Sequence, residues 1–235
     1  MRGKSINQVK FGMRKKFNKN RQEIIPEISV LMTIYKDKDY LSEAIKSILN
    51  QSFKNWEFII IAEPETSEES LKIVRSFHDK RIRLIINETH LGFSSSLNKG
   101  IELARGKYIA RMDADDVSLS NRLLLQWLYM ETHADVILCG TNAYSINVKG
   151  KIIDKTNLPI NSSEVKTWLY FKDVIFHPTV MFRRKQFIDN CFFYREQQAE
   201  DYELWTRVSL KCKIVNLRSV LLKRRLHGKK QYWKI

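Results

Sequence analysis

Three carboxylates lie within four residues in the run Arg111-Met-Asp113-Ala-Asp115-Asp116, which ends a short apolar segment. Carboxylates this close together repel one another unless a cation lies between them. Their hard oxygen atoms suit Mg²⁺ or Mn²⁺, with coordination positions left for the phosphates of a substrate. The D-x-D spacing alone is weak evidence, because an Asp-rich turn that caps the following helix has the same composition. The strands and helices predicted around this run are needed to distinguish a metal site from a capping turn.

Short apolar segments alternate with amphipathic ones on the way to this run. β-Branched segments predict buried strands at 28–34, 56–61, 82–86 and 107–112. Apolar residues at helical spacing predict helices between them, the first with Asp39 as N-cap. This alternation predicts an α/β fold, with a Rossmann-like, mostly parallel central sheet and helices on both faces. Ligands bind at the carboxyl ends of such strands, where the three aspartates lie.

The pattern becomes looser after Asp116. We expect further elements there, namely a helix over about 121–132, a strand at 135–139, a hairpin of 144–148 and 151–154, a helix at 164–171, a strand at 179–182 and a helix at 200–210.

The net charge of +15 is concentrated at the two ends of the chain. Residues 1–25 carry +7 and residues 204–235 carry +10, so the middle is close to neutral at −2. Clustered positive charge suits an anionic membrane surface, a nucleic acid or a phosphorylated substrate, and a solvated tail is the simpler alternative.

The sequence has no apolar run of the length that a membrane span requires and no apolar run behind its basic start, so we expect a cytoplasmic protein. Its three cysteines, Cys139, Cys191 and Cys212, form no C-x-x-C pair, which suits a reducing compartment. We interpret all three as small buried hydrophobic residues.

The chain from Ile28 to His227 resembles the family 2 glycosyltransferases of the GT-A fold, of the kind that builds bacterial polysaccharides. Seven segments carry the resemblance in the family's order: Ile28-Ser-Val-Leu-Met-Thr-Ile-Tyr35, Ser47-Ile-Leu-Asn-Gln-Ser-Phe53, Leu91-Gly92 with Asn98-Lys-Gly100, Gly106-Lys-Tyr-Ile-Ala-Arg-Met-Asp-Ala-Asp-Asp116, His177-Pro-Thr-Val-Met-Phe182, Ala199-Glu-Asp-Tyr-Glu-Leu-Trp205 and Arg225-Leu-His227. Together they cover about 200 residues.

On the donor side, the resemblance implies roles for residues at the strand ends. Thr33 and Tyr35 match positions that contact the nucleotide base, and Arg111 precedes the acidic run. Asp113 and Asp115 match the pair that holds a divalent cation, Mn²⁺ or Mg²⁺, and through it the donor diphosphate. Asp116 supports them, and His227 matches a late histidine that reaches the metal or the diphosphate. The neighbouring arginines Arg224 and Arg225 are candidates for pairing with phosphate oxygens.

On the acceptor side, Glu200 and Asp201 match the family's acidic pair, in which the aspartate is the general base. A single displacement needs a carboxylate opposite the leaving diphosphate to take the acceptor's proton. The alternative for Asp201 is an acid favoured by the helix dipole. His177 lies in a matching segment, and we place it near the acceptor.

The sequence departs from the family in the run Ala62-Glu63-Pro64-Glu65, where relatives carry two aspartates before Gly-Ser. Glu63 occupies the base-reading position with a longer side chain. We divide the chain into a basic flexible leader (1–25), a nucleotide-sugar-binding half (26–140), an acceptor-binding and catalytic-base half that forms a smaller lobe (141–227) and a basic tail (228–235).

The resemblance implies an inverting glycosyltransferase with a UDP-sugar donor and a glycan or lipid-linked acceptor. Its basic ends suggest peripheral contact with the anionic inner face of the plasma membrane. A catalytically degenerate relative that acts as a binding or scaffold protein is the alternative, motivated by the departure at Glu63. We expect no nucleic-acid partner, because the charge is terminal. A sugar-1-phosphate nucleotidyltransferase is disfavoured, since no glycine-rich loop follows the first strand.

Overall fold

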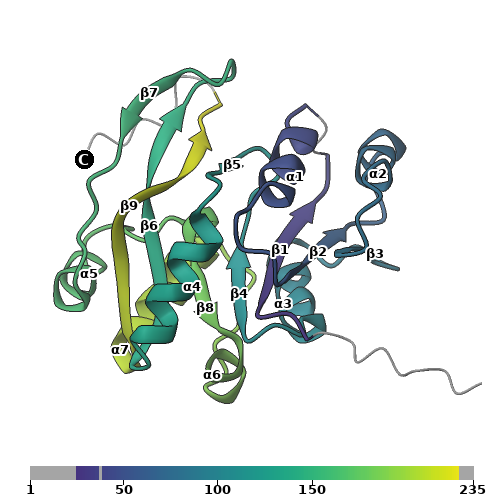
Figure 1. The fold of residues 1–235 in the computed structure, drawn as a ribbon. Helices are drawn as coiled ribbons and strands as arrows, with labels where there is room; N and C mark the ends of the chain where they lie inside the picture. The colour runs from purple at the N-terminus through teal and green to yellow at the C-terminus, as the bar shows by residue number, and fades with distance from the viewer. Residues whose placement is uncertain (1–24, 37–38, 228–235) are drawn as a thin grey trace, which may run out of the picture.

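A computed structural model of the chain describes residues 25–36 and 39–227. The predicted flexible leader and basic tail lie almost wholly outside these ranges. The membrane contact was assigned to the two basic ends, of which residues 204–227 are described, and it stays a prediction. The described residues form an α/β fold around one nine-stranded sheet of order β3-β2-β1-β4-β8-β6-β9-β5, with β7 paired to β6 (Figure 1). The predicted fold class is confirmed.

The first part of the sheet is parallel, as the alternating pattern predicts. Its elements follow in chain order: β1 (Ile28–Ile34), α1 (Leu41–Leu49), β2 (Trp56–Ala62), α2 (Glu68–Arg75), β3 (Ile82–Ile86), α3 (Phe93–Leu103) and β4 (Tyr108–Arg111). β1 pairs in parallel with both β2 and β4, and β2 pairs in parallel with β3. Asp39 is not the cap of α1, because the helix begins after Tyr40 without a side-chain cap.

The second part of the sheet is mixed. Its elements are β5 (Val117–Ser118), α4 (Arg122–Thr132), β6 (Val136–Ile146), β7 (Ile152–Lys155), α5 (Ser162–Trp168), the 3₁₀ helix η1 (His177–Thr179), β8 (Met181–Arg183), α6 (Arg184–Asp189), α7 (Glu200–Lys211) and β9 (Lys213–Arg225). β8 lies antiparallel between β4 and β6, while β9 is parallel to β6. Parallel pairing therefore holds within β1–β4 and again between β6 and β9, and antiparallel pairing joins the remaining strands.

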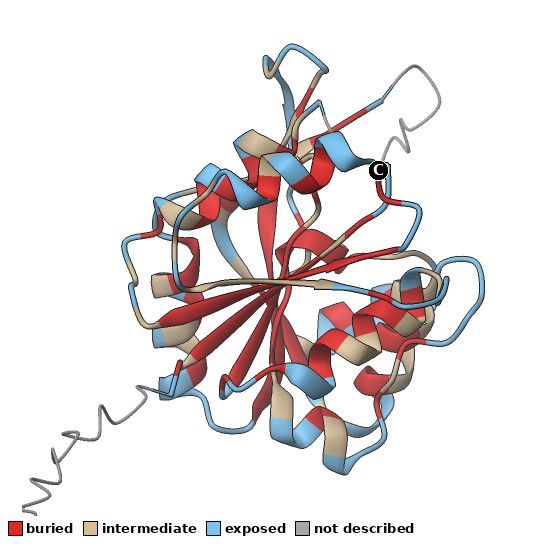
Figure 2. Cartoon of the chain, turned by 90° about the vertical axis from the view of Figure 1, so that its right-hand side faces the viewer, coloured by how far each residue is buried: buried red, intermediate tan, exposed pale blue. Residues whose placement is uncertain are grey.

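Helices cover both faces of the sheet, as Figure 2 shows with its red strands between helices. Successive residues of a strand point to opposite faces, so Val30 and Met32 pack in one core and Leu31 in the other. α1, α2 and α4 supply the first core, and α3, α5, α6 and α7 supply the second. In α3, a Cβ atom at Gly100 would lie 2.2 Å from Leu31 Cδ1, so glycine allows the helix to approach β1.

Two strands differ from the predictions. β6 is one strand of 11 residues rather than two, because pairing partners satisfy the polar residues in its middle. Asn142, for example, accepts hydrogen bonds from the Thr156 hydroxyl and the Leu158 amide. The basic strand β9 was not predicted as a strand at all. The division proposed at residue 140 falls inside β6, so the two halves share one continuous sheet.

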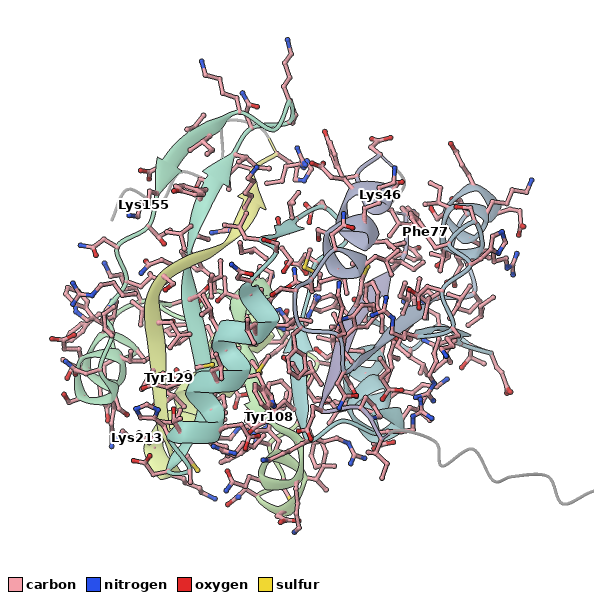
Figure 3. The ribbon with its side chains drawn as sticks, in the orientation of Figure 1. Lys46, Phe77, Tyr108, Tyr129, Lys155 and Lys213 are labelled. Atoms are coloured by element: carbon pink, nitrogen blue, oxygen red, sulfur yellow. The ribbon has the colours of Figure 1, made fainter. Side chains whose placement is uncertain are left out.

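A polar network closes the end of the sheet opposite to the carboxyl end of β4. Tyr108, labelled low in Figure 3, begins β4, donates to Glu131 and accepts from Arg183. Lys107 pairs with the same glutamate at 2.6 Å. These charges are paired with one another at the end of the sheet where parallel strands begin, so we assign them a structural role.

The three cysteines differ in how far they are buried. Cys139 is buried, but Cys191 is exposed and Cys212 is intermediate, so the expectation of three buried cysteines holds only for Cys139.

None of the helices within 25–36 and 39–227 combines the length and the apolar character needed to cross a bilayer.

Candidate active site

The three aspartates that follow β4 form one cluster. Asp113, Asp115 and Asp116 each offer a carboxylate oxygen within 4.8 Å of the others. Asp116 is only 2% exposed; its Oδ1 accepts the Arg225 amide at 2.7 Å, and its Oδ2 has no partner. Burial, together with the charges of Asp113 and Asp115, raises the pKa of Asp116 well above its ordinary value. Such a cluster becomes stable in its ionised form when a cation is bound.

Two buried arginines hold the backbone and one carboxylate of this cluster in place. Arg111 donates to Asp113 Oδ1 at 2.6 Å and to the Met112 carbonyl, and its Nε has no partner. Arg122, at the start of α4, donates to the Arg111 carbonyl at 2.7 Å. Burial lowers the pKa of Arg122 to about 10. Sequence reasoning missed Arg122, whose only signal was a charge on the apolar face of a helix.

β9 brings the late histidine to the cluster across more than 100 residues of sequence. His227 Nε2 lies 2.6 Å from Asp115 Oδ2, and the Tyr40 ring is 5.7 Å from the imidazole. The structure therefore brings His227 to Asp115, with about half of the His227 side chain exposed, while the carboxylates of Asp113, Asp115 and Asp116 form the group of mutually close ligand atoms. The ligand set of Asp113, Asp115 and His227 stays a prediction. The register of β9 against β6 decides this placement, because Ile146 pairs with Arg225 two residues before His227.

Arg225 does not have the expected role of pairing with phosphate. Its guanidinium donates to the Asp115 carbonyl at 2.9 Å and to Glu43 at 2.6 Å, and its side chain is 1% exposed. Further bonds reach the carbonyls of Asn147 and Val148. Arg225 therefore fastens β9 to the acidic turn and to α1. Arg224 lies over the Phe176 ring, 4.8 Å from its centroid.

The buried bonds of Arg225 make it a stability determinant. We expect Arg225→Met to lower the free energy of unfolding by about 3 kcal/mol, since three partly buried carbonyls and Glu43 lose their donor. Urea unfolding followed by circular dichroism measures this change. Arg218→Met is the matched control, because Arg218 belongs to the same strand and is exposed. Equal effects of the two substitutions would contradict the assignment.

The predicted catalytic pair opens α7. Ala199 immediately before it has φ of 54°, a left-handed conformation that costs a non-glycine residue energy and tends to occur at functional turns. Asp201 Oδ1 accepts the amide of Tyr202 at 2.8 Å. Burial raises the pKa of Asp201 and the charge of Asp113 adds to this rise, while burial followed by the charge of Asp201 raises the pKa of Glu200. The two acidic sites thus lie within electrostatic reach of each other.

His177 is buried beside Asp201, as its assignment to the acceptor side requires. Its Nδ1 lies 3.9 Å from Asp201 Oδ2, and its Nε2 is 2.9 Å from the Tyr194 hydroxyl. Burial, with the charge of Arg111, lowers the pKa of His177 well below its ordinary value, so the imidazole is neutral. A neutral ring fixed by Tyr194 is suited to orienting a carboxylate. No sequence signal marked Tyr194.

The carboxyl group of Asp173 lies close enough to Asp201 for the two charges to interact. Burial, together with the charge of Asp201, raises the pKa of Asp173 to about 7. The amide of Ile175 donates to Asp173 Oδ1 at 2.9 Å. Sequence reasoning missed this residue because it lies in a turn without a recognisable motif.

The predicted base-contact residues follow β1 and β2 at the same edge of the sheet. Thr33 is half-buried near the end of β1, and Tyr35 is 38% exposed beyond it. The Tyr35 ring meets the His90 ring edge-on, with centroids 5.9 Å apart. His90, which was not singled out in the sequence, also lies 3.2 Å from Glu65.

Glu63 is 6% exposed, and internal hydrogen bonds engage both of its carboxylate oxygens. Oε1 accepts from Ser96 at 2.5 Å and from Asn87 at 3.2 Å, so its lone pairs are used. Oε2 accepts the Leu91 amide at 3.0 Å, with His90 at 3.6 Å. One lone pair of Oε2 is left for a further N–H donor.

The residues of the acidic cluster fit a divalent cation. Two partly exposed carboxylates and a buried third with an unpartnered oxygen are hard oxygen ligands of the kind that Mn²⁺ and Mg²⁺ sites use, and the His227 imidazole lies beside one of them. A cation there would also offset the burial and the mutual repulsion that raise the pKa of Asp116. The second group with metal-ligating side chains among the described residues is Glu63, Glu65 and His90.

The chain is similar in sequence to known proteins. The model of Glycosyl transferase family 2 matches residues 29–192. The O-antigen biosynthesis glycosyltransferase WbnJ of Escherichia coli is 34% identical over 210 residues, which cover 88% of this chain and 82% of that protein. The amylovoran biosynthesis glycosyltransferase AmsE of Erwinia amylovora is 33% identical over 200 residues, which cover 83% and 74%.

Solved structures share the fold at low sequence identity. TarS 1–349 of S. aureus in complex with UDP-GlcNAc matches with a TM-score of 0.72 and 18% identity, over 87% of this chain and 60% of that one. A mannosyltransferase from Pyrobaculum calidifontis in complex with GDP-Man and Mn²⁺ matches with a TM-score of 0.65 and 13% identity, over 88% and 59%. The chain thus spans about 60% of the length of these solved chains.

Proposed function

Since the chain belongs to glycosyl transferase family 2 and is a glycosyltransferase of the GT-A fold, we propose that it transfers a sugar from a UDP-sugar to a hydroxyl group with inversion. The acceptor in this proposal is a glycan or a lipid-linked glycan. One observation supports it above the others: Asp201 and the Asp113 cluster come from separate segments, yet shared neighbours connect them. Arg111 pairs with Asp113 at 2.6 Å and lies over the Phe93 ring, and Phe93 meets His177, which is 3.9 Å from Asp201.

The acidic cluster is the proposed site for the donor diphosphate. Asp113, Asp115 and His227 would hold a Mn²⁺ or Mg²⁺ ion, with Asp116 as buried support. The ion, when bound, neutralises negative charge on the diphosphate. Arg111 orients Asp113 through their 2.6 Å ion pair and adds a buried positive charge beside it.

Asp201 is the proposed general base, and Glu200 is its neighbour in the acidic pair. As the acceptor oxygen forms its bond to the anomeric carbon, its proton passes to an oxygen of Asp201. The bond from that carbon to the donor diphosphate breaks, and the diphosphate leaves with the electron pair. A raised pKa strengthens Asp201 as a base, which favours proton transfer. His177 and Tyr194 position Asp201 in this proposal.

The nucleotide base is proposed to lie between Tyr35 and Glu63, with Thr33 alongside. The remaining lone pair on Glu63 Oε2 suits an imide N–H such as that of uracil. His90 meets Tyr35 at the same place and would limit the space open to the base. The donor half (26–140), the acceptor half (141–227) and a cytoplasmic site at the inner membrane face remain parts of this proposal.

A donor panel tests the proposed function. We expect UDP-sugars to bind in the presence of Mn²⁺ and to lose measurable binding when EDTA replaces the ion, with GDP- and dTDP-sugars binding more weakly. Isothermal titration calorimetry measures the affinities, and nucleotide release in the presence of acceptor glycans measures turnover. A chain that binds no nucleotide sugar with or without metal would rule out the proposal.

The same panel separates the enzyme from a catalytically inactive binding protein. The internal bonds of Glu63 are the observation that favours this second reading, because they leave little capacity to recognise a base. Donor binding without nucleotide release, unchanged by Asp201→Asn, would establish the binding protein.

A further inference from the structure

Large aromatic side chains are exposed where α5 ends. Trp168, Tyr170 and Phe171 are 44%, 64% and 77% exposed, although they lie within four residues of one another. Leu169 between them is 2% exposed and packs in the core, so it fixes the turn that displays its neighbours. We call residues 168–172 the aromatic turn. Adjacent exposed aromatic residues of this kind mark an interaction surface rather than an ordinary solvated turn.

The charge of the aromatic turn suits an anionic surface. Lys166 and Lys172 flank the aromatic residues, and no acidic residue occurs between Glu164 and Asp173. Lys172 Nζ lies 4.5 Å from the centre of the Trp168 ring. Trp and Tyr at the level of lipid headgroups, with Lys reaching anionic phosphates, is the combination found at membrane interfaces.

A pocket of about 550 Å³ lies beside the turn. Leu158, Pro159, Ile160 and Val174 give it an apolar side, Asn157 adds a polar group, and Trp168 and Lys172 form part of its wall. Glu164 also lines it. α5 lies at the outer side of β9, on the opposite side of the molecule from β3 (Figure 1). A hollow with mixed polar and apolar walls, next to exposed aromatic rings and a lysine, fits the region of a lipid where the hydrocarbon chain meets the headgroup.

We propose that the aromatic turn docks the protein on an anionic lipid bilayer, with Trp168, Tyr170 and Phe171 entering the headgroup region. Lys166 and Lys172 contact lipid phosphates, and the neighbouring pocket receives part of a lipid chain. This surface is separate from the basic ends of the chain, because it relies on apolar contact as well as charge. Its binding therefore persists when salt screens the electrostatic attraction.

The aromatic turn is also joined to the acceptor side of the site. The Tyr202 hydroxyl donates to the Leu169 carbonyl at 2.7 Å, and Tyr202 follows Asp201 directly. Asp173 follows the turn directly, and burial together with the charge of Asp201 raises its pKa. A bilayer on the turn would present a lipid-linked acceptor near Asp201. This last step rests on the proposed function, whereas the docking itself does not.

Vesicle flotation tests the docking. The full chain is mixed with vesicles of phosphatidylcholine and phosphatidylglycerol in equal parts, at about 0.5 M salt, where the Debye length is only about 4 Å. We expect the wild type to float and Tyr170→Ser/Phe171→Ser to lose at least about tenfold in bound fraction, because two aromatic side chains no longer enter the headgroup region. Leu125→Ser/Leu128→Ser on α4 is the matched control, since these exposed leucines lie on another element.

Tryptophan quenching by brominated lipids locates the contact. Quenching of the wild type should be largely lost in Trp168→Phe, which keeps an aromatic side chain. Flotation that disappears at high salt, or that the Tyr170/Phe171 change leaves intact, would overturn the proposal. So would a dimer, seen by sedimentation, that the same change dissociates without affecting flotation. Metal-dependent UDP-sugar binding, measured on every variant, separates failure of docking from failure of the proposed function.

Discussion

Asp201→Asn is expected to lower kcat by about 10²- to 10⁴-fold, the range that a positioned general base contributes. The amide keeps the size of the side chain and can still accept the Tyr202 amide, so the start of α7 should be preserved. Donor affinity should stay within about twofold, because Asp201 lies on the acceptor side. Nucleotide release with saturating donor and acceptor measures kcat, and calorimetry measures donor affinity.

The pH dependence of the reaction supplies a second readout of the same base. Asp201 must be ionised to accept a proton, and burial raises its pKa above the ordinary aspartate value. The wild-type kcat should therefore fall as the pH is lowered through this raised pKa, and recover as the pH rises. The residual activity of Asp201→Asn should lack this acidic limb. Glu203→Gln is the control, because Glu203 lies on the same helix and pairs with Arg207 at 2.8 Å. A variant with wild-type kcat would exclude Asp201 as the base.

Asp115→Asn is expected to weaken metal-dependent donor binding by about 100-fold or more, since even residues that only support metal ligands cost about 10- to 100-fold. An amide supplies one oxygen without charge, so the cluster loses attraction for a divalent cation. Removing one negative charge also relieves repulsion on Asp116, so the folded state should not be destabilised. The measurement is the UDP-sugar dissociation constant across a Mn²⁺ titration.

The matched control for this prediction is Asp154→Asn. Asp154 is an exposed aspartate on β7 and belongs to neither acidic cluster. Its substitution should leave the Mn²⁺ titration unchanged. A donor affinity that Asp115→Asn does not alter, or that is equally strong in EDTA, would show that the cluster holds no catalytic cation.

Local patterns in the sequence predicted the first four strands and most helices to within a few residues. They did so because the periods of 2 and 3.6 residues are properties of single elements and need no partner. The acidic run was identified in the same way: its residues follow an apolar strand directly, and parallel strands gather their carboxyl ends at one edge. The resemblance to a family then supplied Asp201, His177 and His227, whose roles no local pattern could reveal.

β9 shows what a local pattern could not predict. Its many Lys and Arg residues look like a solvated tail, yet Val215 and Leu222 are buried against β6, which lies more than 70 residues earlier. The stability of such a strand comes from hydrogen bonds and burial supplied by a distant partner. The same pairing buries Arg225, so this candidate phosphate ligand instead donates hydrogen bonds to the backbone of the acidic turn.

The sequence by itself thus determined which chemical groups the protein carries and at which strand ends they lie. The tertiary structure alone decided which of those groups remain available. Glu63 and Arg225 are engaged in internal bonds, whereas Asp116 keeps an oxygen without a partner. The physical reason is that burial and hydrogen-bond satisfaction depend on residues far apart in the chain, and only the packed fold sets both.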